Sequence, residues 1–176
     1  MERIAAPLRG IYRDILTGRD GRVVHDSGWK SNTVVDSCRT LLAGFVRNAT
    51  AGGISFLAVG QGDAAWDSSG APAPDPATTT DLVNRFSETV PAADLVLEYL
   101  DAGDNVTGTP TSRLQVTATL PPGFPAALPG LSTYPLREFG LFGSLDGSDL
   151  MINCIRHPVI HKDEGSSLIR VVRLYF

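Results

Sequence analysis

The last ten residues, Ser167-Leu-Ile-Arg-Val-Val-Arg-Leu-Tyr-Phe176, are rich in β-branched and aromatic side chains. Such residues favour β-strands, so we expect this stretch to be a strand held in a sheet up to its last residue. Its arginines, Arg170 and Arg173, are three residues apart and therefore fall on opposite faces of that strand. Because both faces cannot belong to the core, one face is expected to meet solvent or a partner subunit, where arginine forms ion pairs.

Hairpin signals precede this strand. The turn at Thr17–Gly21 separates two runs with strand character within residues 10–29, and its glycines supply the positive φ that hairpin turns need. Asp146-Gly147 separates the apolar runs 136–142 and 149–156 in the same way. Further strands are predicted at 53–60, 95–100 and 113–120. Short strands at this spacing predict a mainly β (α+β) fold, with an antiparallel β-sandwich or a barrel-like sheet.

One segment has a helical period instead. Apolar side chains recur three and four residues apart between residues 33 and 46, at Val34, Val35, Cys38, Leu41, Leu42, Phe45 and Val46. This spacing predicts one amphipathic helix. Ser31 or Asn32 can cap its start. Its apolar stripe is expected to pack on the buried strand at 53–60.

Two proline-rich stretches interrupt the pattern, at residues 63–80 and 121–131. Their composition favours extended backbone, so both are predicted to be surface loops or arms that reach another subunit. Trp66 either anchors the first stretch to its own domain or docks onto a neighbour. Residues 81–86 fit a helical turn or the start of a strand. The candidate interface residues are Trp66, Pro72, Pro74, Phe124, Leu128, Arg170 and Arg173.

Composition narrows the class of protein. The 176 residues suit a single β-rich domain, 1–176, with the proline-rich stretches as its loops or arms. The net charge of −4 and dispersed basic residues argue against nucleic-acid binding. No run approaches 18 apolar residues, so no membrane span is expected. The first residues lack the pattern of a secretory signal, which predicts synthesis in the cytosol.

The sequence offers no clustered reactive residues. Cys38 and Cys154 lie far apart without a Cys-x-x-Cys motif, which predicts buried free thiols. His157 and His161 could share a strand face and bind a metal together with another chain, but a hydrogen bond near a strand end is the preferred interpretation. No phosphate-binding loop or serine nucleophile motif is present. We therefore predict a protein that is not an enzyme, with no catalytic, cofactor-binding or metal-binding residues.

The order of these features resembles the tail-associated structural proteins of tailed bacteriophages and of phage-tail-like contractile particles. The matching stretches are residues 28–45, 54–62, 137–142 and 157–162, followed by 168–176. The resemblance implies a subunit that docks at a fibre base, collar or baseplate. Its implied partners are other copies of itself, as a homo-oligomer, and other tail or baseplate proteins. Its implied location is a virion or tail-like particle assembled in the host cytoplasm.

Two alternatives remain at this point. The chain could be a carbohydrate-binding β-sandwich that recognises host surface glycans, with Trp66 and Tyr134 as an exposed aromatic platform. It could also be a hydrolase of cell-wall glycans, for which the carboxylates Glu98, Asp101 and Asp104 provide no identifiable acid and base pair.

Overall fold

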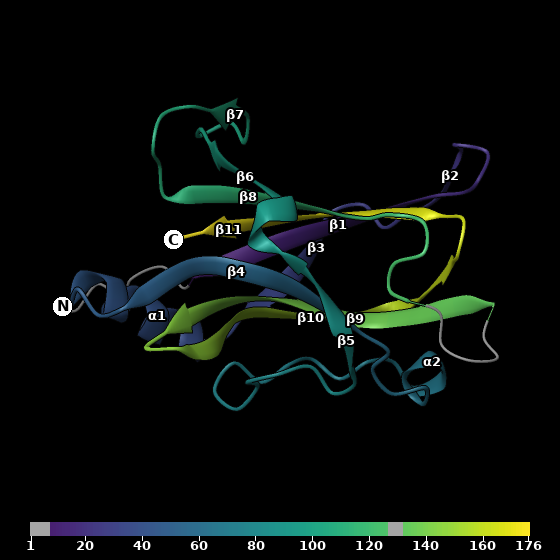
Figure 1. Cartoon of the computed structure of the whole chain (residues 1–176), viewed down its shortest axis with the longest axis horizontal. Coiled ribbons are helices and arrows are strands. Elements are labelled where there is room, and N and C mark those ends of the chain that lie inside the picture. The colour runs from purple at the N-terminus through teal and green to yellow at the C-terminus, as the bar shows by residue number, and fades with distance from the viewer. Residues whose placement is uncertain (1–7, 127–131) are drawn as a thin grey trace.

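The computed structural model describes residues 8–126 and 132–176, so Leu128 lies outside the described residues. Eleven strands form one antiparallel sheet, which curls so that its two halves face each other (Figure 1). The mainly β fold with one amphipathic helix is therefore confirmed. The strands are β1 (Arg9–Thr17), β2 (Val23–Asp26), β3 (Lys30–Val34), β4 (Ala51–Gly60), β5 (Arg85–Pro91), β6 (Leu95–Leu100), β7 (Val106–Thr107), β8 (Arg113–Leu120), β9 (Thr133–Leu145), β10 (Ser148–Asp163) and β11 (Ser167–Tyr175).

The sheet folds over at β3. One half contains β5, β4, β9 and β10, and the other contains β1, β11, β8, β6 and β7, with β2 paired to β1. Lys30 pairs with β1 in the second half, whereas Thr33 and Val34 pair with β10 in the first. A strand that changes partners in this way makes the corner of a sandwich. The two halves are thus layers of one continuous sheet.

The main core lies between these layers. Val116, Ala118 and Leu120 of β8 point inward and are buried, as their alternation predicted. Across the core, Tyr12 of β1 meets Phe139 of β9 edge to face, with 5.5 Å between ring centroids. Aromatic pairs prefer this geometry. The contact ties the two layers together near their middle.

The predicted hairpins are confirmed. The turn between β9 and β10 consists of Asp146 and Gly147, whose φ values are 49° and 81°. Two positive φ angles are typical of the turn that matches the twist of a hairpin. The register of β9 and β10 shifts between Arg156 and Ile160, around Pro158, because proline cannot donate to the ladder. Residues 81–86 lead into a strand, which begins at Arg85.

The predicted start of the helix is wrong. Helix α1 (Asp36–Val46) begins after Val35, which is extended and carries no side-chain cap. Ser31 and Asn32 belong to β3 and do not cap it. Val34, which was counted in the apolar spacing of the helix, belongs to strand β3 and pairs with Asn153 in the sheet. The helix packs against β10 and β9, and less extensively against β4.

The first proline-rich stretch lies on its own domain. It contains the one-turn helix α2 (Trp66–Ser69), and the 3-10 helix η1 (Ala92–Asp94) follows β5. Arg156 of β10 donates to the carbonyl of Pro72 at 3.2 Å, and the amide of Asp36 donates to the carbonyl of Pro76 at 2.9 Å. A second apolar cluster is buried on this outer face, formed by Val35, Ala58, Leu82, Phe142, Met151 and Cys154. Residues 63–80 therefore run along the outer side of the first layer.

Cys38 and Cys154 are both buried and free, as predicted. Burial raises the pKa of the Cys154 thiol to about 12 and that of the Cys38 thiol to about 11. Both sulfurs therefore stay protonated and behave as small apolar groups at neutral pH. None of the described helices is long and apolar enough to cross a membrane.

Candidate functional site

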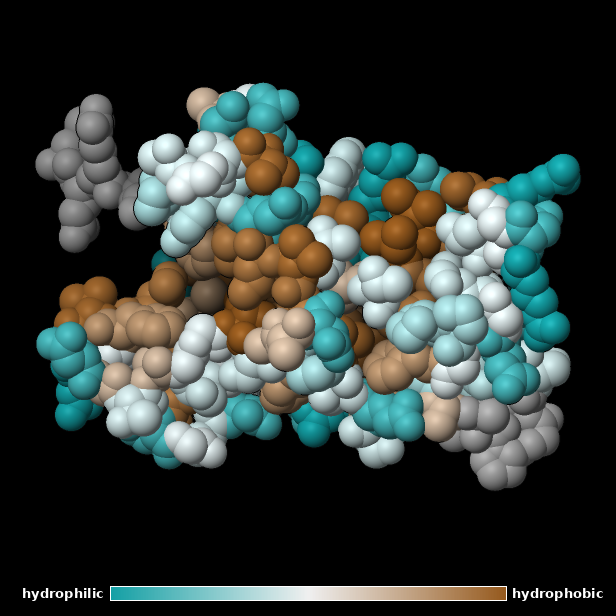
Figure 2. Space-filling model, turned by 45° about the horizontal axis from the view of Figure 1, so that its top comes forward, coloured by the Kyte–Doolittle hydropathy of each residue, from teal (hydrophilic) through white to brown (hydrophobic). Residues whose placement is uncertain are grey.

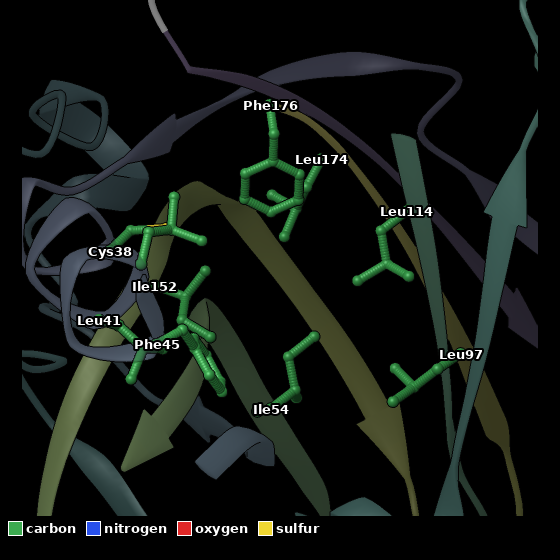
Figure 3. A pocket seen from close by; sticks show the side chains of 11 residues that line it. Cys38, Leu41, Phe45, Ile54, Leu97, Leu114, Ile152, Leu174 and Phe176 are labelled. Atoms are coloured by element: carbon green, nitrogen blue, oxygen red, sulfur yellow. The ribbon is translucent and has the colours of Figure 1, made fainter. Parts of the chain in front are cut away.

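The curled sheet is open at the end where α1 lies, and an apolar groove lies in this opening (Figures 2 and 3). We call it the end groove. It has a volume of about 240 Å³. It is lined by Cys38, Leu41, Leu42, Phe45, Gly53, Ile54, Leu97, Leu114, Ile152, Leu174 and Phe176. These residues come from α1, from both layers of the sheet and from the residue after β11.

The groove exposes side chains that belong to the interior of the sandwich. Leu97 of β6 pairs with the buried Val116 of β8 and shares its inward face, yet it is 46% exposed. Phe45 of α1 is 42% exposed although it belongs to the apolar stripe of the helix. Exposed apolar side chains gathered in one place mark a binding surface, whereas scattered ones are ordinary. The described residues thus leave the core uncovered at this end.

Two strand edges border the groove. β5 pairs with β4 from Phe56 to Gly60, and no described strand pairs with the same edge at residues 51–55. In the other layer, β7 pairs with β6 at Tyr99 and Leu100, and the edge of β6 before Tyr99 has no partner among the described strands. In Figure 1 the first half of β4 extends past η1 with no strand in front of it. An edge of this kind offers free backbone donors and acceptors.

Chemically, the end groove suits apolar groups. None of its lining side chains carries a charge. Its volume lies below the range of about 300–1,000 Å³ that is usual for small-molecule pockets, and such pockets also contain a few convergent polar groups. The groove therefore fits a few apolar side chains of a protein segment better than a whole ligand.

A second noteworthy region is a charged cluster inside the sandwich. Asp14 of β1 and Arg170 of β11 are cross-strand partners on the inward face, and both are 0% exposed. Arg170 Nε lies 3.1 Å from Asp14 Oδ1, without the alignment of a hydrogen bond. The guanidinium of Arg170 also lies over the ring of Phe139, 3.9 Å from its centroid. This ion pair therefore lies in the core between the two layers, where apolar side chains usually pack.

His157 of the opposite layer completes this cluster. Its Nε2 lies 2.7 Å from Arg170 Nη2, and its Nδ1 lies 2.7 Å from the carbonyl of Pro158. Arginine is always a donor, so Nε2 accepts and Nδ1 carries the proton that is donated to Pro158. Burial, reinforced by the charge of Arg170, lowers the pKa of His157 to about 3. Burial also raises the pKa of Asp14, against the opposing effect of Arg170.

A small polar cavity adjoins the cluster. Tyr12, Asp14, His25, Lys30 and His157 are among its lining residues, and its volume is about 50 Å³. This is room for one or two water molecules at about 30 Å³ each. Arg170 contacts both Asp14 and His157, which leaves little freedom for a substrate. We interpret the cluster as a structural link between the two layers. The period-2 alternation of β1 and β11 places Asp14 and Arg170 on inward faces, and sequence reasoning overlooked this signal.

The predicted interface residues do not form one surface. Arg170 is fully buried, so its assignment to an interface is wrong: its partner Asp14 lies within the same core. Arg173 is on the outer face, where it pairs with Asp104 at 3.5 Å and lies over the ring of Trp29. Neither arginine lines the end groove.

The described parts of the proline-rich stretches, residues 63–80 and 121–126, also stay close to the domain. Trp66 packs where a Cβ at Gly62 would stand and lies 5.3 Å from the guanidinium of Arg156. Pro72 and Pro74 line a depression against β10 with a volume of about 340 Å³. Phe124 is half-buried and packs against the main core. Its stretch begins at Pro121, whose carbonyl accepts a 2.8 Å hydrogen bond from Lys162.

Two further arrangements considered from the sequence are not formed. Tyr134 is 2% exposed, so it cannot join Trp66 in an exposed aromatic platform. His157 is buried whereas His161 is exposed, because the register shift around Pro158 lies between them. Within residues 8–126 and 132–176, no three His, Cys, Asp or Glu side chains are grouped as metal ligands would be.

No protein-family model, curated protein or solved structure gave a significant match to this chain.

Proposed function

We propose that this chain is a structural subunit of a phage tail or phage-tail-like particle, and that it docks other subunits at a fibre base, collar or baseplate. The observation that carries the proposal is the end groove. Its apolar side chains and bordering strand edges form a surface that another protein segment can complete.

The type of particle is supported by the sequence resemblance. The stretches 28–45 and 54–62 carry part of that resemblance, and they also supply one side of the groove. Cys38, Leu41 and Phe45 come from the first stretch, and Ile54 comes from the second. In this proposal the chain acts without catalysis and without a cofactor. Its partners are further copies of itself and other tail or baseplate proteins.

Imaging the particle tests this proposal. Tail-like particles are purified from the producing host, the chain is located by mass spectrometry, and a cryo-electron microscopy map is calculated. We expect this chain at a defined position, with the density of another subunit covering the end groove. A chain that is missing from every purified particle and remains a free monomer would contradict the proposed function.

A further inference from the structure

The depression between β10 and the first proline-rich stretch has the features of a ligand site that is separate from the end groove. It is formed by residues 31–33 of β3, residues 71–74 and residues 154–156 of β10. We call it the Arg156 depression. We propose that it binds a sugar acid, which is a small polyhydroxy carboxylate, and that Arg156 holds the carboxylate. This ligand site does not depend on the proposed docking function.

The Arg156 depression arises where β3 leaves β10. Thr33 pairs with Cys154 of β10, whereas Asn32 already pairs with β1. Beyond Cys154, this edge of β10 has no partner among the described strands, so a gap opens beside Arg156. The proline-rich stretch closes the other side of the gap, where Arg156 Nη1 donates to the carbonyl of Pro72 at 3.2 Å. The guanidinium therefore reaches from one wall of the depression to the other.

Arg156 differs from the other arginines in its electrostatic environment. Within residues 8–126 and 132–176, it is the one half-buried arginine that has no carboxylate partner. The remaining buried and half-buried arginines each pair with an aspartate: these are Arg13, Arg113, Arg137, Arg170 and Arg173. No other residue that lines the depression carries a charge. A positive charge without an opposing carboxylate favours an anionic ligand, and the planar guanidinium suits a carboxylate.

The guanidinium of Arg156 is held in place and still has unused donors. It lies over the ring of Trp66, 5.3 Å from the ring centroid, an arrangement that favours a fixed orientation. Arginine has five N–H donors. Its Nε is buried and has no hydrogen-bond partner among the described residues, and the same is true of Oδ1 of Asn32. Buried polar groups are normally hydrogen-bonded, so these atoms indicate a place that a ligand or water completes.

The size and the remaining walls of the depression favour a sugar acid over a simpler acid. Its volume of about 340 Å³ lies within the range of about 300–1,000 Å³ that is usual for small-molecule pockets. The hydroxyls of Ser31 and Thr33 and the amide of Asn32 can exchange hydrogen bonds with ligand hydroxyl groups. Pro72 and Pro74 provide apolar contact. An aliphatic acid would leave the polar lining groups unpaired, which costs binding free energy.

An NMR titration of the ¹⁵N-labelled protein with sodium glucuronate tests the inference. Glucose, at the same concentration and ionic strength, is the neutral probe. We expect glucuronate to shift the backbone amides of residues 31–33, 71–73 and 154–156, with a Kd on the order of 1 mM for a ligand of this size. Glucose should bind at least roughly tenfold more weakly, because it cannot form charge-assisted hydrogen bonds with Arg156.

Two substitutions test whether the ligand lies in the depression. Arg156→Met should weaken glucuronate binding at least roughly tenfold. Arg47→Met is the matched control, since it removes the same charge from an exposed arginine and should bind as the wild type does. Ala73→Phe keeps Arg156 and adds a bulky ring at an exposed position that lines the depression, so it should also lose binding. Urea unfolding shows whether each variant is folded.

Several results would overturn the inference. Glucuronate that shifts no amide, or shifts only amides outside the depression, would contradict the site. Equal binding of glucose and glucuronate, or equal weakening by Arg156→Met and Arg47→Met, would contradict the role of Arg156. Wild-type affinity in a folded Ala73→Phe would contradict the position of the ligand. The proposed function would stand in each of these cases, because the end groove takes no part in the experiment.

Discussion

The end groove and the charged cluster reverse the usual distribution of side chains. At the end groove, apolar residues such as Leu97 and Phe45 remain exposed, whereas Asp14 and Arg170 are sealed in the core. The charges of the cluster are paired within the same molecule, whereas the described residues leave the groove uncovered. The comparison suggests that the buried charges serve the fold and that the exposed apolar side chains serve binding.

The largest effect is expected at the charged cluster. Arg170→Met leaves the carboxylate of Asp14 buried without its partner, so the free energy of unfolding should fall by about 3–5 kcal/mol. Denaturation in urea measures this. Arg173→Met is the matched control on the outer face of the same strand and should cost about 1 kcal/mol or less. Equal losses for the two variants would contradict the structural role of the cluster.

A smaller loss of stability is expected for a substitution at Gly143, where α1 contacts the sheet beside the groove. A Cβ at Gly143 would lie 2.6 Å from Leu41 Cδ2 and 2.8 Å from the carbonyl oxygen of Gly53. Gly143→Ala should therefore destabilise the protein by about 1–3 kcal/mol through overpacking. Gly108→Ala, where a Cβ meets nothing within 4 Å, is the control. Thermal unfolding that is unchanged by Gly143→Ala would show that this contact is not tight.

The pH dependence of stability also separates the two regions. The pKa of His157 is about 3 in the folded protein and 6.5 in its ordinary state. Between these values the unfolded chain binds a proton that the folded chain does not. This contribution is therefore fully present above pH 6.5 and is lost as the pH falls toward 3, by up to about 1.4 kcal/mol per pH unit.

The raised pKa of Asp14 acts in the opposite direction, because its folded carboxyl binds a proton more readily than the unfolded one. The contribution of His157 is the difference between the wild type and His157→Gln in how the free energy of unfolding changes with pH. Unfolding in urea between pH 7 and pH 5 should show a shallower loss for His157→Gln. His161→Gln, at an exposed position, should follow the wild type. If the free energy of unfolding of His157→Gln fell with pH as steeply as that of the wild type, His157 would not be a buried neutral histidine.

The smallest effect on stability is expected in the groove itself. Leu97→Asp places a carboxylate at a side chain that is 46% exposed, so the free energy of unfolding should change by no more than about 0.5 kcal/mol. The outer-face variant Val96→Asp should behave alike in urea. A large loss for Leu97→Asp alone would indicate that the groove is part of the monomer's own core.

Much of the fold follows from local patterns. The alternation of β8, the Asp146-Gly147 turn and the apolar run of β4 each have a local cause that can be identified in the sequence. The start of α1 could not be found in this way, because Val34 and Val35 fit both a helical stripe and the strand that pairs with β10. Deciding between them requires a contact with Asn153, which is distant in the sequence.

The groove was harder to predict from the sequence than the strands and turns. The apolar stripe of α1 was identified, but its spacing cannot show that Phe45 stays exposed. The interface prediction for Arg170 failed because a charged residue was expected at a surface, although its place in the alternation of β11 pointed inward. The exposed edge of β4 depends on where β5 leaves the sheet, at Pro91, which is a property of the whole topology.

Sedimentation velocity over a range of protein concentrations tests most directly whether the end groove joins molecules. The wild type, Leu97→Asp and Val96→Asp are compared at neutral pH, after urea unfolding has shown equal stability. We predict that the wild type and Val96→Asp associate as the concentration rises, and that Leu97→Asp remains a monomer. Equal association of all three proteins would contradict a binding role for the groove.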